Sequence, residues 1–341
     1  MKTSSLRSFA VTVAIAISFI ACTATQQASL IPASTTRQSA RPAAQQARDS
    51  KAHVVPLGDV VVWKPCTHKG DSCECGYSNG ESKPGVYACL HASSPNFGIA
   101  TSRQLAPANG NLLYGGFGKT VVVFKGTKQV ATLTGLTGEP IGLAVDRVGN
   151  VWATDSPAAT ISEFAKGATK PTATYTDANL TSASYLAVDP AGGVYVEGQA
   201  ADGIEVDVLA AGSSTFAPIS QPGKVGLTAG GLAVQSRGTT TYVWINDEGT
   251  ASTTAAISRY VLKGSSLYLK GSFGYNGVNG AIWADPSGES GAHVWAVNNV
   301  PYGSGFNTSA IEYAMPGGKI IAATIPTTMS VQAVGVAGTM K

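Results

Sequence analysis

The stretch Glu139-Pro140-Ile141-Gly142-Leu143-Ala144-Val145-Asp146-Arg147-Val148-Gly149-Asn150-Val151-Trp152-Ala153-Thr154-Asp155 contains two short apolar runs separated by a polar turn. Runs of this length, rich in Val and aromatic residues and divided by Asp, Gly and Asn, predict two strands of a hairpin. A third run starts at Ile161 and ends in Gly167. The stretch is therefore the beginning of a small antiparallel sheet.

The same pattern returns along the chain. The first strand ends at Asp146, Asp189, Gln235 and Asp285, which are 43, 46 and 50 positions apart. The second strand carries an aromatic residue at one fixed place, and the third strand ends in Gly. A fourth strand follows, as in 129–133. The second-strand aromatics are Trp152, Tyr195, Trp244 and Trp295, with Tyr114 upstream; the glycines are Gly126, Gly167, Gly212, Gly264 and Gly317.

Four strands in each 40 to 50 residues is the spacing of β-propeller blades. Ordinary hairpins could imitate one copy, but not four in register. Residues 139–155 closely resemble an NHL repeat, as found in NHL and gluconolactonase-like propellers. The resemblance is clear over 139–177, moderate to 328 and weak elsewhere, and it implies an all-β propeller.

Closure of the ring fixes the number of blades. Residues 331–338 match a first strand with no successor, so their blade needs strands from the N-terminal side. We assign 59–64 as its third strand and 85–90 as its fourth, with 98–101 opening the next blade, which gives six blades. In the alternative the last strand joins 111–137, which gives five blades and leaves 53–100 as a cap.

Composition agrees with this fold class. Only 13% of the 341 residues are charged, and 40 are Gly, while 44% are hydrophobic. Many glycines with few charges suit short strands and tight turns better than a helical bundle, and ordinary hydrophobicity excludes an unfolded chain. Without Lys2 and Arg7 the formal charge falls to 21 against 20, or +1, which gives no indication of a nucleic-acid partner.

The N-terminus predicts export. Lys2 and Arg7 precede an apolar run over 9–21 that is too short to span a bilayer comfortably, so residues 1–21 are read as a signal peptide. Residues 18–22 resemble the lipobox of bacterial lipoproteins, with Phe19 where Leu is usual, which implies lipidation of Cys22. Thr23 after the Cys implies the outer membrane or cell surface rather than the inner membrane. The alternative is an ordinary signal peptide cut nearby.

The next segment reads as a tether. Residues 22–52 are rich in Ala, Gln, Ser, Thr and Pro and have no apolar period, so we expect a disordered, lipid-anchored linker before a propeller over 53–341. The protein is thus predicted to lie outside the cytoplasm on the cell envelope, held to the membrane by its lipid anchor.

Four cysteines fall within a Cys-rich N-terminal segment, 66–89, of this exported chain: Cys66, Cys73, Cys75 and Cys89. Two disulfides are expected, either 66–73 with 75–89 or 66–75 with 73–89, because Cys73 and Cys75 are too close to bond to each other. A zinc site with His68 and His91 is the alternative, although the Cys spacing fits no common zinc pattern.

The loops that enter first strands and follow second strands meet at one end of a propeller channel, where ligands usually bind. We predict a polar, weakly acidic mouth there. Calcium is the ion such oxygen ligands suit, and the gluconolactonase-like resemblance implies the same chemistry. The mouth residues are Glu139, Ser184, Thr228, Asn279 and Gln332 from the first set, and Asp155, Glu197, Asn246, Asp247 and Asn298 from the second.

Two interpretations of these residues stay open. Asp155, Asp247 and Asn298 occupy corresponding places in three blades, where NHL repeats carry a turn-capping Asp or Asn, so a structural role is favoured for them. Glu139 and Glu197 do not recur, which makes them the better functional candidates. The repeated aromatics are expected to pack between blades rather than to form a carbohydrate platform.

Other catalytic classes find little support. His293 is the one histidine outside the Cys-rich segment and the tether border, and neither a Ser-His-Asp set nor a G-x-S-x-G elbow is present. The favoured function is binding or scaffolding at the cell envelope, without catalysis or a cofactor, and its partner is an envelope protein or a small ligand on the propeller face. The alternative is a calcium-dependent lactonase-like hydrolase built on Glu139, Asp155 and Asp247, and a purely structural envelope role stays open.

Overall fold

The structure is a computed structural model that describes residues 61–65, 73–78, 85–91, 105–108, 112–125, 128–221, 229–247, 256–274, 281–284, 291–302, 305–323, 327–329 and 335–337. All of them belong to one compact unit, Val54–Lys341. They contain strands and turns only, and none of them forms a helix long and apolar enough to cross a membrane. The predicted signal peptide, Cys22 and tether lie outside the described residues.

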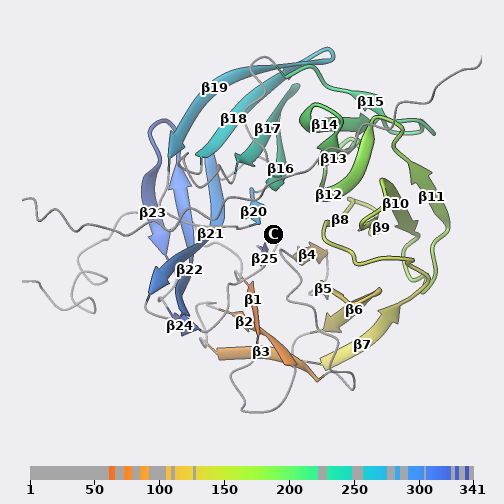
Figure 1. Cartoon of the computed structure of the whole chain (residues 1–341), viewed down its shortest axis with the longest axis vertical. Coiled ribbons are helices and arrows are strands. Elements are labelled where there is room, and N and C mark those ends of the chain that lie inside the picture. The colour runs from red at the N-terminus through yellow and green to blue at the C-terminus, as the bar shows by residue number, and fades with distance from the viewer. Residues whose placement is uncertain are drawn as a thin grey trace, which may run out of the picture. The chain divides into compact units, whose positions relative to one another are not determined.

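Six antiparallel sheets surround a common centre (Figure 1). Five are built from consecutive strands, innermost first except where stated. The first is β4 (Leu105–Ala108), β5 (Leu112–Phe117), β6 (Thr120–Lys125) and β7 (Lys128–Leu133). The second is β8 (Leu143–Val145), β9 (Val151–Asp155), β10 (Thr160–Phe164) and β11 (Ala173–Thr176). The third is β12 (Leu180–Val188), β13 (Val194–Ala200), β14 (Gly203–Leu209) and β15 (Ala217–Pro218).

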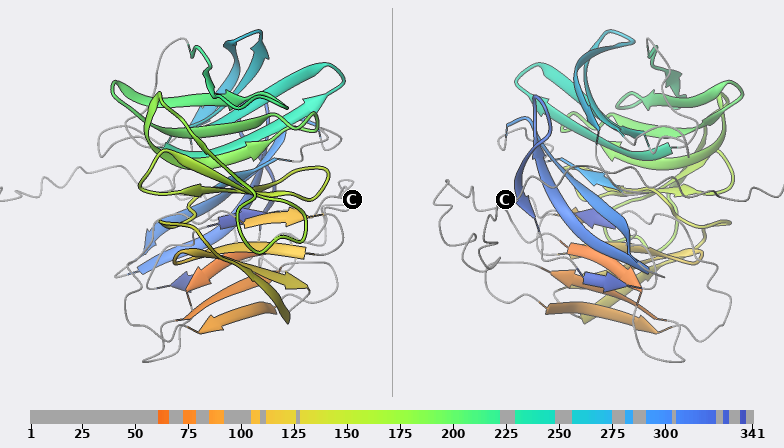
Figure 2. Two further views of the ribbon diagram at one scale, coloured as in Figure 1. Left: turned by 90° about the vertical axis from the view of Figure 1, so that its right-hand side faces the viewer. Right: turned by 60° about the vertical axis from the view of Figure 1, so that its left-hand side comes forward.

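The next two sheets continue the order. The fourth is β16 (Ala229–Arg237), β17 (Thr240–Asp247), β18 (Ala256–Lys263) and β19 (Ser266–Gly274). The fifth is β20 (Ile282–Trp283), β21 (His293–Tyr302), β22 (Gly305–Ala314) and β23 (Lys319–Ala323), with β24 (Thr327–Met329) also paired to β22. The side views show how strongly these sheets twist (Figure 2). The predicted all-β propeller is confirmed.

The sixth sheet joins both ends of the propeller. It runs β25 (Gly335–Ala337), β1 (Val61–Pro65), β2 (Cys73–Ser78) and β3 (Gly85–His91). Val61, Val62 and Trp63 lie opposite Ala337, Val336 and Gly335. The last strand therefore pairs with the N-terminal strands, as the six-blade prediction requires, rather than with residues 111–137.

Two details of that prediction are corrected. The strand assigned as third in the closing blade is the second, because the segment 73–78 supplies an unforeseen third strand between it and β3. The next blade opens with β4 at 105–108, after the predicted 98–101, which lie outside the described residues. The miss has a simple source, since the Cys-Glu-Cys-Gly-Tyr-Ser sequence of β2 has little of the apolar pattern on which the repeat was recognised.

The Cys-rich segment can be compared only by backbone register. Cys75 lies opposite Cys89, and Cys73 lies opposite His91, across β2 and β3. Directly opposite residues on antiparallel strands have the Cα separation that a disulfide needs. This register suits the 75–89 pairing, which stays a prediction. Cys66 and His68 lie outside the described residues.

Each blade turn between first and second strands is organised by the strand-ending Asp. Asp146 Oδ1 accepts backbone N–H bonds from Val148, Gly149 and Asn150 at 3.0, 2.8 and 2.8 Å. Gly149 has a φ of 96°, which side-chain-bearing residues rarely adopt. Asp189 accepts the equivalent bonds in the next blade. The repeat motif thus encodes the turn that reverses the chain.

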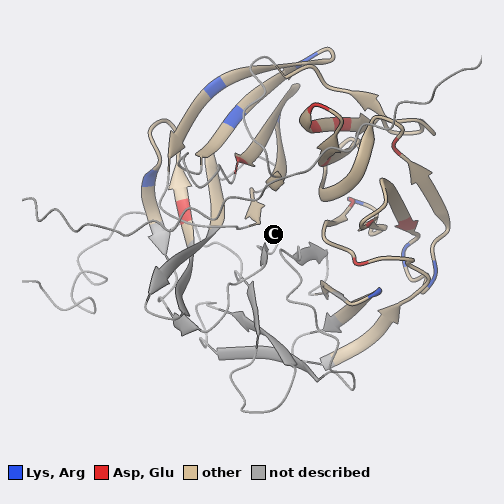
Figure 3. Ribbon diagram, viewed as in Figure 1, with Lys and Arg blue, Asp and Glu red and all other residues tan. Residues whose placement is uncertain are grey.

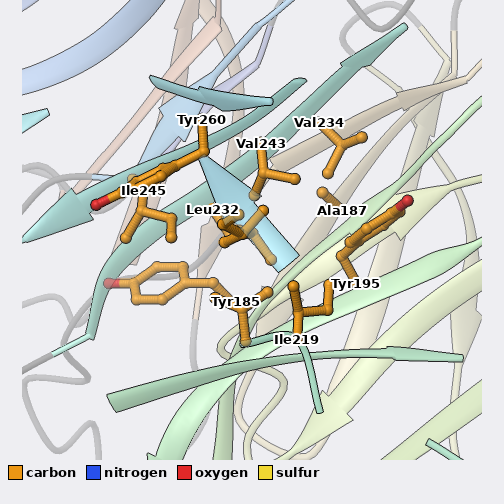
Figure 4. Packing of buried hydrophobic residues seen from close by; sticks show 12 residues of the cluster. Tyr185, Ala187, Tyr195, Ile219, Leu232, Val234, Val243, Ile245 and Tyr260 are labelled. Atoms are coloured by element: carbon orange, nitrogen blue, oxygen red, sulfur yellow. The ribbon is translucent and has the colours of Figure 1, made fainter. Parts of the chain in front are cut away.

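The hydrophobic core lies between blades rather than within them. In the cluster of Figure 4, Leu232 of β16 lies among side chains of the preceding blade, such as Tyr185, and of its own blade, such as Ile245. Three further clusters join the other described neighbours in the same way. The five repeat aromatics are all buried, with exposed fractions of 0–7%. Their predicted packing role is confirmed.

Candidate functional site

Asp155 ends β9 and is buried, at 4% exposure. Its Oδ2 accepts bonds from the Thr137 backbone N–H at 2.9 Å and the Thr137 hydroxyl at 2.8 Å, and its Oδ1 accepts the Gly138 N–H. A carboxylate surrounded by donors from its own chain caps the loop that enters β8. This geometry supports the structural interpretation of Asp155.

Glu139 lies in the same loop. Its backbone exchanges two hydrogen bonds with Ser156, at 2.9 and 3.1 Å, and its side chain is half-buried. The backbone pair fixes the loop against the β9–β10 turn. Within the described part of the chain, no hydrogen bond or ion pair holds the Glu139 carboxylate, so it stays a candidate.

Glu197 is fully buried in β13, where its Oε2 accepts the Gly231 N–H of the next blade at 3.2 Å. Strand register places it at the same position as Thr154 in β9 and Asn246 in β17. Thr154 Oγ1 accepts the Gly142 N–H at 2.7 Å and donates to the Ser184 carbonyl of the next blade at 3.2 Å.

Asn246 completes the series, because its Nδ2 donates to the Gly230 carbonyl at 3.2 Å. In all three blades this buried position hydrogen-bonds to the backbone at the start of an innermost strand. The reasoning that singled out Glu197 because nothing like it recurs is therefore corrected. The carboxylate is unique, but a buried polar side chain at that place is a feature of the repeat.

The remaining mouth residues are more scattered. Asp247 ends β17 and is half-buried, and Asn298 lies within β21 with its side chain outside the described residues. Thr228, Asn279 and Gln332 also lie outside them. Among the described side chains, no group of three His, Cys, Asp or Glu is placed to hold a metal ion. Glu139, Asp155 and Asp247 are thus not brought together as a ligand set.

His293 has a partner on the neighbouring strand. Its Nδ1 lies 3.1 Å from Glu312 Oε1, across β21 and β22. Burial raises the pKa of the Glu312 carboxyl, and His293 partly opposes that shift. Both residues sit in register beside Val294 and Tyr313 of the core, which suits a structural pair.

A pair of buried carboxyl groups escaped the sequence reasoning. Asp177, between β11 and β12, is 1% exposed, and Asp207, in β14, is 0% exposed. Asn179 bridges them: its backbone N–H donates to Asp177 Oδ1 at 2.9 Å, and its Nδ2 donates to Asp207 Oδ2 at 2.7 Å. Asp177 Oδ2 and Asp207 Oδ1 are buried without a donor. Figure 3 shows acidic segments on and beside β14.

This environment changes the acidity of Asp207. Burial is the main cause that raises its pKa, to about 7, and the charges of Asp177 and Glu205 act in the same direction. The bond from Asn179 opposes them. A proton on Asp207 can then be donated to Asp177, which satisfies the oxygens that otherwise lack a donor.

The third-strand register held a signal for this pair. Asp207 occupies the place that Ser162 and Ser258 occupy in two other blades, next to a buried apolar position. An acid at a place where other blades carry serine is unusual for a strand interior. The partner, Asp177, comes from an irregular connection and has no such signal.

A cavity of about 360 Å³ lies between the blade β4–β7 and the turns of the next blade. We call it the blade cleft, and define it by Leu112, Val130, Ala131, Arg147, Val148 and Lys166, which surround its opening, with Val123 and Leu133 of the core deeper inside. The turns concerned join β8 to β9 and β10 to β11. They lie at the opposite strand ends from Asp155 and Glu139, so the cleft is separate from the predicted mouth.

No protein-family model matches the chain, and no curated protein matches it either. Several solved structures are similar to it. The Kuenenia stuttgartiensis hydrazine synthase shares 12% identity at a TM-score of 0.49, over 68% of each chain. A chain of a nidogen/laminin complex shares 15% identity at a TM-score of 0.54, over 83% of this chain and 98% of that one. U3-55K shares 12% identity at a TM-score of 0.52, over 81% and 84%. Likeness at this level of identity shows the β-propeller fold alone.

Proposed function

We propose that this protein is a lipid-anchored binding or scaffolding module of a bacterial cell envelope, with an NHL-like propeller held on a flexible tether. The observation that carries the binding role is the closed ring, in which β25 pairs with β1 and fixes the blades into one rigid body. A rigid frame that presents loops binds with little loss of conformational entropy. The lipobox resemblance at Cys22 and the polar segment after it support the anchor and the tether.

A binding role also agrees with how the mouth residues are used. Asp155, Thr154 and Glu197 each hydrogen-bond to backbone groups of the propeller, so their polar atoms stabilise the frame. An envelope protein or a small ligand on a propeller face is the partner we propose. Nothing in the arrangement of the described residues favours the lactonase-like alternative over this role.

Replacing Cys22 by Ser is expected to release the protein from the membrane. A thioether-linked diacylglyceryl group requires the Cys sulfur, and Ser cannot accept it. Wild-type full-length protein expressed in a two-membrane bacterium should incorporate labelled palmitate and sediment with the outer membrane. The C22S variant should do neither, whereas Cys89→Ser should still be labelled. Unlabelled wild-type protein in the soluble fraction would contradict the anchor.

Calcium is expected to leave the thermal midpoint of the protein unchanged. An ion that binds only the folded state must raise the midpoint, by an amount that grows with its concentration. Melting curves of the wild type and of Glu139→Gln should coincide with and without millimolar calcium. A rise in the wild type that Glu139→Gln abolishes would instead make the calcium-dependent hydrolase the leading function.

A further inference from the structure

The blade cleft has an apolar floor that the folding of the core does not fill. Leu112, Ala131 and Val148 line it beside buried core residues, and Val148 and Val130 are 66% and 48% exposed. Cavities of roughly 300–1,000 Å³ with mostly apolar walls are the usual sites of small molecules. At about 360 Å³ the cleft is large enough for one flexible apolar chain.

The walls of the cleft are fixed by hydrogen bonds. Asn150 accepts the Lys166 N–H at 3.0 Å and donates to Glu163 Oε1 at 3.2 Å, which ties the β8–β9 turn to the β10–β11 turn. The Thr134 N–H donates to the Thr169 carbonyl at 2.8 Å, which ties the second turn to the preceding blade. Together with the three N–H bonds to Asp146, these contacts preorganise the cleft for a ligand.

Two cations stand at the opening. Arg147 and Lys166 are exposed, and the Lys166 stem packs over Gly149, where an added Cβ would lie 3.2 Å from its Cδ. No Asp or Glu lines the cleft. The neighbouring carboxylates already have partners: Asp146 accepts backbone N–H groups, and Glu163 accepts bonds from Asn150 and the Tyr175 hydroxyl at 3.2 Å. The positive charge at the opening is therefore available to an anion.

We infer that the blade cleft binds a medium-chain carboxylate of the fatty-acid class. The apolar chain lies against Leu112, Ala131 and Val148, and the carboxylate lies at the opening, where Arg147 and Lys166 donate charge-assisted hydrogen bonds to it. This combination of apolar walls and cationic opening explains both features with one ligand. The inference goes beyond the proposed function, because binding in solution requires neither the anchor nor the envelope.

Titration calorimetry of the purified full chain tests it with three probes. Decanoate has both the chain and the charge, 1-decanol has the chain alone, and acetate has the charge alone. We expect decanoate to bind at one site, and 1-decanol and acetate to bind at least about tenfold more weakly, or not measurably. Raising the salt concentration should weaken decanoate binding, because its ion pairs are exposed.

Variants assign the site to the cleft. Arg147→Gln and Lys166→Gln should each weaken decanoate binding by about fivefold or more. Val148→Asp, which places a negative charge on the floor, should abolish it. Lys170→Gln is the matched control, since Lys170 is an exposed cation near the same turn but does not line the cleft. It should bind decanoate as the wild type does.

Two results would overturn the inference. Equal binding of decanoate and 1-decanol would show that the cations recognise nothing, and equal loss in the Lys170→Gln control would show only a general charge effect. Absence of decanoate binding by wild-type protein with an unchanged melting curve would also reject it. None of these outcomes bears on the membrane fractionation of the C22S variant, so this inference and the proposed function fail separately.

Discussion

Replacing Asp207 by Asn is expected to stabilise the protein at pH 8 and to change its stability little at pH 4.5. The folded chain holds a proton on Asp207 up to about pH 7, whereas an unfolded Asp loses it near 3.8. The contribution of a raised pKa to folding is fully present below the unfolded value and is lost as the pH rises through the folded value. Wild-type stability should therefore fall between about pH 4 and pH 7.

The expected size follows from the width of that window. One pKa unit corresponds to about 1.4 kcal/mol, so the wild type should lose on the order of 2–4 kcal/mol that Asp207→Asn does not lose. The Asn side chain keeps the acceptor for Asn179 and donates to Asp177 in place of the proton. Urea unfolding of both proteins at pH 4.5 and pH 8 measures the difference.

The matched control is Asp146→Asn, which removes an acid from a turn but keeps the oxygen that caps it. It should retain the wild-type pH dependence. A double-mutant cycle with Asp177→Asn should show that the two carboxyl groups are coupled, since either substitution removes the same repulsion. Parallel stability curves for wild type and Asp207→Asn across this pH range would rule out the buried acid pair as their source.

Removing the last strand is expected to open the ring. A chain that ends at Val334 lacks β25, and with it the pairing of Gly335, Val336 and Ala337 to β1. Each lost backbone hydrogen bond contributes about 0.5–1.5 kcal/mol, and β1 becomes an exposed edge that can pair with other chains. The truncated protein should unfold at a urea concentration lower by an easily measured margin and should associate at high concentration.

Two companions make this test specific. A chain that ends at Gly338 keeps β25 and should behave as the wild type. A synthetic peptide of residues 330–341 should restore the midpoint of the shorter chain by strand addition, and should have no effect on the wild type. A chain ending at Val334 that unfolds as the wild type does would show that β25 contributes nothing to closure.

The repeat pattern was enough to predict the propeller and its closing sheet, because each blade spends the same residues on the same tasks. Asp146 and Asp189 cap turns, and Trp152, Tyr195 and Trp244 fill the space between blades. Such local and periodic demands are visible in a sequence. The strand β2 was missed because its Cys, Gly and Ser residues do not show the apolar alternation of the other blades.

The candidate site was less predictable, because it depends on contacts between blades. Glu197 looked singular along the chain, yet strand register aligns it with Thr154 and Asn246. The blade cleft and the Asp177–Asp207 pair bring together residues from different blades or from irregular connections. Their positions follow from how sheets twist against each other, and no spacing in the sequence reports that.

The pairing of β25 with β1 also sets the order of events in biosynthesis. Strands β1 to β3 leave the ribosome first, but their sheet lacks its innermost member until residues 335–337 follow, nearly the whole chain later. At 5–20 residues per second, that delay is roughly 10 to 50 seconds. An exported chain spends this interval unfolded or partly assembled, with the edge of β1 unprotected. We therefore expect the yield of folded protein to depend on holding chaperones outside the cytoplasm more than its final stability would suggest.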